Sequence, residues 1–182
     1  MARKSEHTFR PETLRPMTSR PVTLRAAVTP ADLGAVRAIV EATGFFREDE
    51  IDIAVELVEC RLDKGPASGY DFLFAESDNL VVGYACFGPI PCTLGSYDLY
   101  WIAVSPTCQR DGVGRRLLFE VESQVACAGG RCIYIETSGR PQYAPTREFY
   151  QTCGYAVAAV LPDFYDDGDD KVIWHKTLAR HE

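Results

Sequence analysis

The stretch from Gln109 to Arg115 reads Gln-Arg-Asp-Gly-Val-Gly-Arg, and its residue types suit the binding of a phosphate group. Gly112 and Gly114 let the backbone approach a ligand closely, and the start of a helix offers unpaired N–H groups and a partial positive charge. Arg110 and Arg115 add cationic side chains. The stretch therefore favours a pyrophosphate-binding turn, although a Gly-X-Gly sequence alone is also typical of a tight turn that binds nothing.

The spacing of this turn excludes two common phosphate-binding motifs. No Gly-Lys-Ser/Thr sequence ends it, so it is not a Walker loop. It does not belong to an early βαβ unit, so it is not a Rossmann fingerprint. The nucleotide-binding folds built on those motifs are therefore excluded.

A second stretch with chemical potential is residues 163–170, Asp-Phe-Tyr-Asp-Asp-Gly-Asp-Asp, which carries five aspartates. Calcium is one interpretation, but the EF-hand spacing and its final glutamate are missing, so we expect no metal site. Aromatic walls beside carboxylates fit a cationic amine. A solvated turn around Gly168 is the alternative.

Periodicity and turn residues predict the elements that must position these two stretches. The first helix is expected to be capped by Thr29, with Pro30 in its first position and Asp32 facing the positive end of its dipole. The predicted elements are a strand at 22–28, helices ending at Gly44 and Gly65, a hairpin at 71–76 and 80–88, a strand at 97–104, a helix from Val113 to about 128, a strand at 132–136, a helix near 145–153, and strands at about 155–161 and 171–178.

Composition limits the class of protein. The chain has 182 residues, 46% of them hydrophobic, and a net charge of −7, which fits one domain at residues 22–182. Six Arg or Lys residues lie in the first 25, and we expect a flexible basic arm at 1–21. The acidic body argues against nucleic-acid binding, and no apolar run is long enough for a membrane span. We expect a cytoplasmic protein whose seven cysteines are reduced.

The turn also resembles the acetyl-CoA motif of the GNAT superfamily of acetyltransferases, which is Gln/Arg-X-X-Gly-X-Gly/Ala after a strand that ends in an apolar triplet. Here Gln109-X-X-Gly112-X-Gly114 follows Ile102-Ala103-Val104.

Two further features are similar to the same superfamily. Tyr150-Gln-Thr-Cys-Gly154-Tyr155 resembles its Tyr-X-X-X-Gly-Phe/Tyr stretch, and the order of the elements from 22 to 178 agrees with its fold. The resemblance therefore covers nearly the whole of the predicted domain.

The resemblance implies an α/β GNAT fold of order β-α-α-β-β-β-α-β-α-β-β, with a mixed seven-stranded sheet. Strands 4 and 5 would splay apart, so that the pantetheine of acetyl-CoA lies between them. At position 143 this chain has tyrosine where many relatives have asparagine. The implied coenzyme-binding residues are Ile102, Ala103, Val104, Gln109, Arg110, Asp111, Gly112, Val113, Gly114, Arg115 and Tyr143.

Acetyl transfer from a thioester to an amine needs a proton acceptor, because the amine is protonated near neutral pH. It is also helped by a proton donor, because the leaving group departs as a thiolate. Asp98 is the first candidate base, since it resembles the carboxylate that some members use on the fourth strand; its alternative is an exposed or acceptor-binding charge. Glu136 is the second candidate base, acting through water. Tyr150 is the implied general acid, and a core tyrosine is its alternative role.

The 163–170 stretch is similar to the Tyr-Tyr-X-Asp-Gly-Glu-Asp loop of protein N-terminal acetyltransferases in the same superfamily, where tyrosines contact the acceptor. Aromatic residues that alternate on a strand are also common in cores. The candidate acceptor-binding residues are Tyr97, Tyr100, Phe164, Tyr165, Asp166 and Asp169.

The sequence therefore predicts an acetyl-CoA-dependent N-acetyltransferase that acylates a primary amine in a ternary complex. The acceptor is either a small amine or a peptide amino terminus. The rival hypothesis is a CoA-binding regulatory or assembly domain without turnover. The oligomeric state is left open, a homodimer included.

Overall fold

The computed structural model describes residues 21–179, and its element order confirms the predicted one. The predicted basic arm lies outside the described residues apart from Pro21. The elements are β1 (Thr23–Arg25), α1 (Ala31–Thr43), α2 (Glu48–Lys64), β2 (Asp71–Ser77), β3 (Leu80–Pro89), β4 (Ser96–Val104), α3 (Val113–Cys127), β5 (Cys132–Ser138), α4 (Ala144–Thr152), β6 (Ala156–Asp166) and β7 (Asp169–Thr177), with short 3-10 turns η1 (Gly65–Ser68), η2 (Pro106–Cys108) and η3 (Pro141–Tyr143).

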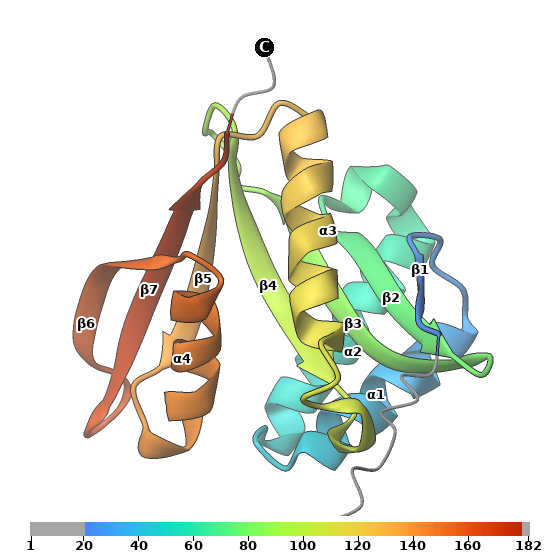
Figure 1. Cartoon of the computed structure of the whole chain (residues 1–182), viewed down its shortest axis with the longest axis horizontal. Coiled ribbons are helices and arrows are strands. Elements are labelled where there is room, and N and C mark those ends of the chain that lie inside the picture. Colours follow the sequence, from blue (N-terminus) through green and yellow to red (C-terminus); the bar gives the residue numbers. More distant parts are fainter. Residues whose placement is uncertain (1–20, 180–182) are drawn as a thin grey trace, which may run out of the picture.

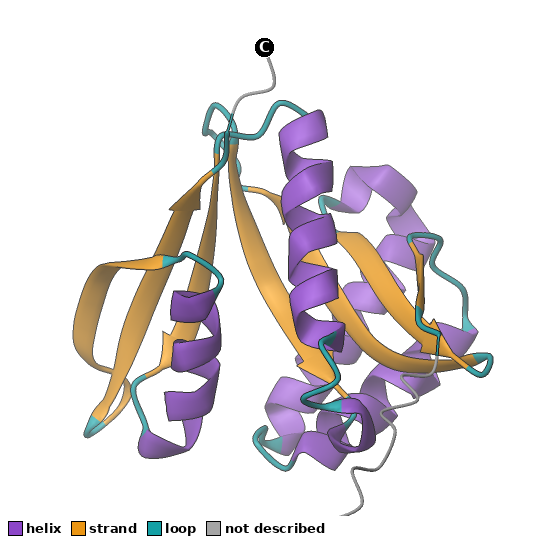
Figure 2. Cartoon of the chain, viewed as in Figure 1, coloured by secondary structure: helices purple, strands orange, loops and turns teal. Residues whose placement is uncertain are grey.

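The strands form one mixed sheet of seven, in the order β1-β2-β3-β4-β5-β7-β6. All neighbours are antiparallel except β4 and β5, which are parallel. Helices α1 and α2 cover one face of the β1–β4 half, while α3 and α4 lie on the other face of the sheet (Figures 1 and 2). Each face has its own buried apolar cluster, so the sheet is fixed from both sides.

Strands β4 and β5 splay apart, as predicted (Figure 1). A bulge in β4 accompanies the separation. Trp101 lies opposite Cys86 and Leu99 opposite Phe87, which leaves Tyr100 as an extra residue on β4. Such a bulge bends its strand. The β4–β5 ladder accordingly ends at the pair Leu99–Ile135, and the two strands diverge beyond it.

The start of α1 differs from the prediction. Thr29 does not cap the helix; its N–H and hydroxyl instead donate to the carboxylate of Asp32, at 2.7 and 3.0 Å. Arg25 also donates to this carboxylate, at 2.8 Å. Because Asp32 is buried, its charge must be satisfied from nearby donors, and the hydroxyl of Thr29 serves that need rather than the helix end.

The two last strands are longer than the sequence indicated. Most of the 163–170 stretch belongs to β6 and β7, and only Asp167 and Gly168 form the turn between them. Gly168 has a φ of 75°, a left-handed conformation that glycine adopts without strain, so the hairpin can close within two residues. The first strand, by contrast, covers only Thr23–Arg25 of the predicted 22–28.

Two further findings concern the cysteines and the lengths of the helices. The seven cysteines are free thiols. No helix within residues 21–179 is long and apolar enough to cross a membrane.

Candidate active site

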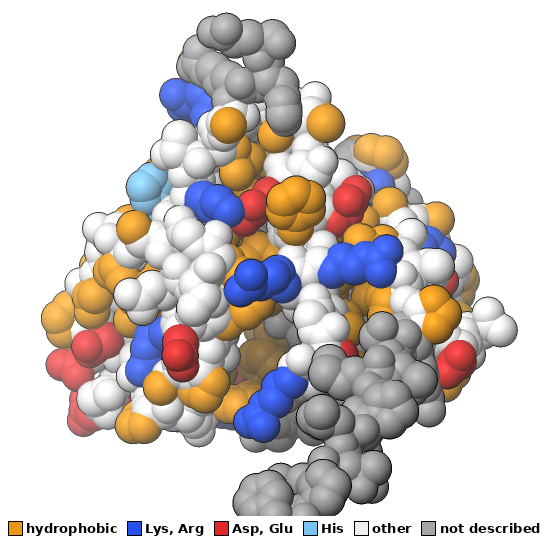
Figure 3. Space-filling model, in the orientation of Figure 1, with side chains coloured by type: hydrophobic (Ala, Val, Ile, Leu, Met, Phe, Trp, Pro, Cys, Tyr) orange, Lys and Arg blue, Asp and Glu red, His pale blue; other side chains and the backbone are white. Residues whose placement is uncertain are grey.

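A cavity of about 360 Å³ lies where β4 and β5 separate. Its walls are β4 from Leu99 onward, Gln109, β5 from Ile135 onward, the end of α1, the α1–α2 connection and the start of α2, the segment of η3 and α4, and one residue each from β6 and β7. On the opposite side from α1 and α2, the molecular surface is hollowed between α3 and α4, and Lys or Arg side chains border the hollow (Figure 3). A volume of this size suits a small ligand or part of a larger one.

The splay leaves main-chain groups on two strands without a strand partner on the cavity side. Residues 102–104 of β4 pair only with β3, and residues 136–138 of β5 pair only with β7. The amide of Gln109 closes the end of the β4 edge by donating to the carbonyl of Val104 at 3.2 Å. Such an edge can bond an extended, amide-bearing chain as an additional strand. Pantetheine has this chemistry, so the residues of the predicted apolar triplet fit it.

The predicted phosphate turn lies at the amino end of α3. Gly112 has a φ of 81°, and α3 begins at the next residue. The first N–H that bonds back into the helix turn is that of Arg116, which donates to the Gly112 carbonyl at 3.0 Å. The N–H groups before it have no acceptor within the helix, and they carry the positive end of the helix dipole. These donors suit a diphosphate.

The coenzyme-binding residues predicted in the turn differ in burial and in their position relative to the cavity. Gln109 is the one that lines the cavity. The side chain of Val113 is buried in the core, so only its N–H is offered to a ligand. The exposed members of the turn are Gln109, Arg110, Asp111, Gly112 and Arg115.

Tyr150 lines the cavity from α4 and is only 3% exposed. Its ring packs against those of Tyr155 and Trp174, at centroid distances of 5.9 and 6.4 Å. Burial raises the pKa of the Tyr150 hydroxyl well above its ordinary value. The hydroxyl is therefore protonated at neutral pH.

The two candidate bases occupy different positions. Glu136 lines the cavity from β5, and its Oε2 lies 2.6 Å from Nζ of Lys171. Asp98 lies deeper on β4, half-buried, and does not line the cavity. Burial raises the pKa of Asp98, the negative charge of Glu136 raises it further, and Lys171 lowers it in part. No ion pair or hydrogen bond of the Asp98 carboxylate is found within the described part of the chain.

Comparison with known proteins agrees with this geometry. Residues 68–157 match the family model of the acetyltransferase (GNAT) domain. A crystal structure of a putative acetyltransferase of the GNAT family from Desulfovibrio desulfuricans is 51% identical, with a TM-score of 0.86 over 87% of this chain and all of that one. The chain belongs to the GNAT family of acetyltransferases.

Two further proteins are more distant relatives of this GNAT chain. An uncharacterized N-acetyltransferase of Methanocaldococcus jannaschii is 33% identical over 58% of this chain, and the matched part spans 65% of that protein, just under two thirds. A putative acetyltransferase from Salmonella typhimurium, solved with its cofactor acetyl-CoA, has a TM-score of 0.69 at 22% identity over 89% of this chain and 96% of that one. The latter likeness is one of fold.

The acidic hairpin of this GNAT chain uses its carboxylates mainly for its own structure. Asp169 is buried and lies 3.0 Å from Nε of Arg140, which also approaches Asp166 at 3.5 Å. The carboxylates of Asp163 and Asp170 accept main-chain hydrogen bonds inside the hairpin, at 2.8 and 3.0 Å. Asp169 lines the cavity and Asp166 does not. The hairpin is thus less of a free negative surface than its sequence suggested.

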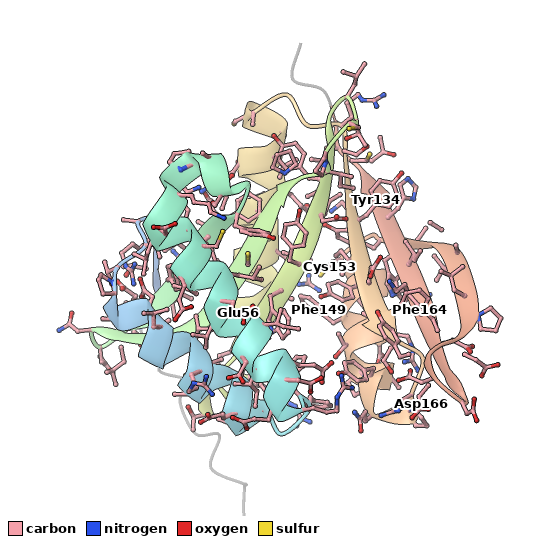
Figure 4. The ribbon with its side chains drawn as sticks, turned by 180° about the vertical axis from the view of Figure 1, so that it is seen from behind. Glu56, Tyr134, Phe149, Cys153, Phe164 and Asp166 are labelled. Atoms are coloured by element: carbon pink, nitrogen blue, oxygen red, sulfur yellow. The ribbon has the colours of Figure 1, made fainter. Side chains whose placement is uncertain are left out.

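The predicted acceptor-binding aromatics separate into two groups. Tyr100 and Tyr165 line the cavity. Phe164 does not line it, and its ring lies against Lys171; Tyr97 packs against the core on the α3 face of the sheet. Seen from behind, the hairpin that carries Phe164 and Asp166 lies across the opening from α2, which carries Glu56 (Figure 4). The expected contact of Tyr97 with acceptor therefore has no support in the geometry.

Sequence reasoning missed the α1–α2 connection and the first turn of α2, which contribute Phe45, Arg47 and Glu50 to the cavity wall. The ring of Phe45 lies 5.7 Å from that of Tyr143, the predicted coenzyme residue in η3, and the two meet across the cavity. Two adjacent aromatic residues in a short helix connection were a signal of this role, because such residues need a surface to pack against.

No cluster of three or more potential metal ligands occurs in residues 21–179.

Proposed function

We propose that this GNAT protein transfers the acetyl group of acetyl-CoA to a primary amine by direct attack in a ternary complex. One observation carries the proposal: the same cavity is lined by three features. They are the β4 edge that is free to bond the pantetheine, the carboxylate of Glu136, and the buried hydroxyl of Tyr150. The acceptor is a small amine or a peptide amino terminus.

Three features support acetyl-CoA as the acyl donor. The edge of β4 offers main-chain groups to an extended ligand, and the turn before α3 offers N–H groups to a diphosphate. The structural relative from Salmonella typhimurium was solved with acetyl-CoA. When bound, acetyl-CoA would supply the acetyl group as a thioester.

The side chains of the cavity would then manage two protons. Glu136 accepts a proton from the ammonium of the acceptor, directly or through water, because its carboxylate lies on the cavity wall. The amine nitrogen would bond to the acetyl carbon as the carbon–sulfur bond breaks, and the Tyr150 hydroxyl would donate its proton to the departing sulfur. The proton that the nitrogen loses as the amide forms would return to the Tyr150 oxygen, so the products are the N-acetyl amide and the free thiol of coenzyme A. Main-chain N–H groups of β4 stabilise the negative charge that develops on the carbonyl oxygen.

Replacing Tyr150 by phenylalanine should lower kcat about 100-fold, because the proton donor is lost while the ring keeps its packing. A thiolate is a good leaving group, so the loss is expected near the lower end of the range for acid catalysis. Steady-state kinetics give kcat, and calorimetry should give an almost unchanged dissociation constant for acetyl-CoA. Turnover within a factor of two of the unmodified protein would make Tyr150 a structural residue.

Thiol release from acetyl-CoA in the presence of a panel of amines tests the proposed function itself. The panel should include amino sugars, polyamines, amino-acid derivatives and short peptides with free amino termini. Acceptor-dependent release supports the enzyme and identifies the acceptor class. Acetyl-CoA binding in calorimetry with no release for any amine would support the non-catalytic CoA-binding domain instead.

A further inference from the structure

The ammonium group of Lys171 on β7 connects the proposed base to the acidic hairpin. Its Nζ lies 2.6 Å from Oε2 of Glu136 and 3.7 Å from the centre of the Phe164 ring. The Tyr165 ring centre is 5.5 Å away. Only 12% of the Lys171 side chain is exposed, so this cation is held by protein groups rather than by water.

This arrangement changes the role of the aromatic residues of the hairpin. Aromatic faces next to a carboxylate form a site for a cation, and the sequence suggested that the acceptor ammonium would occupy it. In the structure the chain's own Lys171 fills that site. Phe164 and Tyr165 therefore hold Lys171, and Lys171 in turn holds Glu136.

The neighbouring carboxylates differ in whether they have a cationic partner of their own. Glu50 pairs with Arg47 and Asp169 pairs with Arg140, at 3.7 and 3.0 Å. Asp98, on β4, has no such partner in the described part of the chain, and it interacts electrostatically with Glu136.

Lys171 is thus the cation that balances two carboxylates, Asp98 and Glu136. The other titratable groups near this cluster are Tyr100 beside Asp98, and Tyr143 beside Tyr165.

We propose that Lys171 is a positioning residue that keeps the Glu136 carboxylate directed along the cavity wall, and that offsets the charge of Asp98 behind it. This inference rests on the proposed function, in which Glu136 accepts the proton of the amine. Lys171 itself forms no bond with the substrates. Its effect comes from the ion pair, which fixes the position of the carboxylate.

The same strand offers a matched control. Lys176 also forms an ion pair, with Glu122 of α3 at 2.7 Å, but Glu122 does not line the cavity, whereas Glu136 does. Lys176→Met therefore removes a comparable β7 ion pair without changing the charges around Glu136. Lys171→Met removes the cation of interest, and Lys171→Arg keeps it.

The split between kcat and KM should separate positioning from structure. In Lys171→Met, kcat at neutral pH should fall about 10-fold, since the carboxylate is no longer held in place. The KM of a cationic acceptor should not rise, because the site becomes more negative. Lys171→Arg should restore most of the activity, and Lys176→Met should leave kcat unchanged.

A second readout does not depend on turnover. Lys171 lowers the pKa of Asp98, so Lys171→Met should raise it further; carbon-13 NMR of the carboxyl groups, assigned with Asp98→Asn, measures this. If the methionine variant does not fold by circular dichroism, Lys171→Gln replaces it.

An unchanged kcat with an unchanged Asp98 titration would overturn the inference. So would a loss that appears only as a higher acceptor KM, which would indicate a structural role for the hairpin. If the unmodified protein releases no thiol with any amine, the proposed function fails, and the Asp98 titration alone decides whether Lys171 balances the two carboxylates.

Discussion

Replacing Gly112 by glutamate is expected to weaken acetyl-CoA binding about 100-fold. The new carboxylate would stand at the amino end of α3, where the free N–H groups of the helix favour an anion. Two unit charges about 6 Å apart near a protein surface repel by about 3 kcal/mol, which corresponds to a factor of about 100. Isothermal calorimetry with acetyl-CoA measures the effect, and it should shrink at high salt.

Two variants at the same position separate charge from backbone strain. Gly112 has a left-handed φ, so any side chain there strains the backbone by about 1–2 kcal/mol, but a Cβ would meet no atom within 4 Å. Gly112→Ala and Gly112→Gln share that strain without the charge, and both should bind acetyl-CoA more tightly than Gly112→Glu. Equal affinities for the glutamine and glutamate variants would place the diphosphate elsewhere.

Glu136→Gln should lower kcat about 1000-fold at neutral pH, because the amide cannot accept the proton of the acceptor ammonium. Asp98→Asn, which changes a carboxylate behind the cavity wall, should cost about 10-fold. Both variants keep the size of the side chain, so acetyl-CoA affinity serves as the control for folding. Measured kcat values for the two variants with the best amine decide between the candidate bases.

The opposite ranking would identify Asp98 as the base, in accordance with the first candidate from the sequence. A further check uses the electrostatics of the pair. Glu136 raises the pKa of Asp98, so Glu136→Gln should bring the pKa of Asp98 down toward its ordinary value. An unchanged Asp98 titration would mean that the two carboxylates act independently.

The parts of the fold that sequence reasoning predicted correctly depend on local patterns. The β4 strand, the 109–115 turn and helix α3 carry their own β-propensity, glycines and helical spacing, and they lie where the sequence placed them. The splay of β4 and β5 came from the family resemblance. The bulge at Tyr100 that accompanies it has no signature in the sequence, because its register depends on pairing with β3.

The site was predicted less completely, because its charged side chains pair with residues that are distant in the sequence. Nothing local shows that Arg140, just before η3, pairs with Asp169, or that the ammonium of Lys171 lies over the Phe164 ring. The five aspartates therefore looked like a free anionic surface. Tyr97 and Tyr100 are also indistinguishable in the sequence, although one packs toward α3 and the other lines the cavity. Long-range partners decided each of these roles.

The short β4–β5 ladder also determines where this sheet can exchange its amide hydrogens. Only four residue pairs, from Ser96–Cys132 to Leu99–Ile135, join the two strands by hydrogen bonds. Main-chain N–H groups of residues 100–104 that face the cavity should therefore exchange with deuterium quickly, although they lie mid-sheet, while those bonded to β3 exchange slowly. A coenzyme bound as the missing strand would slow the fast set, so deuterium uptake with and without acetyl-CoA would trace the length of backbone that it covers.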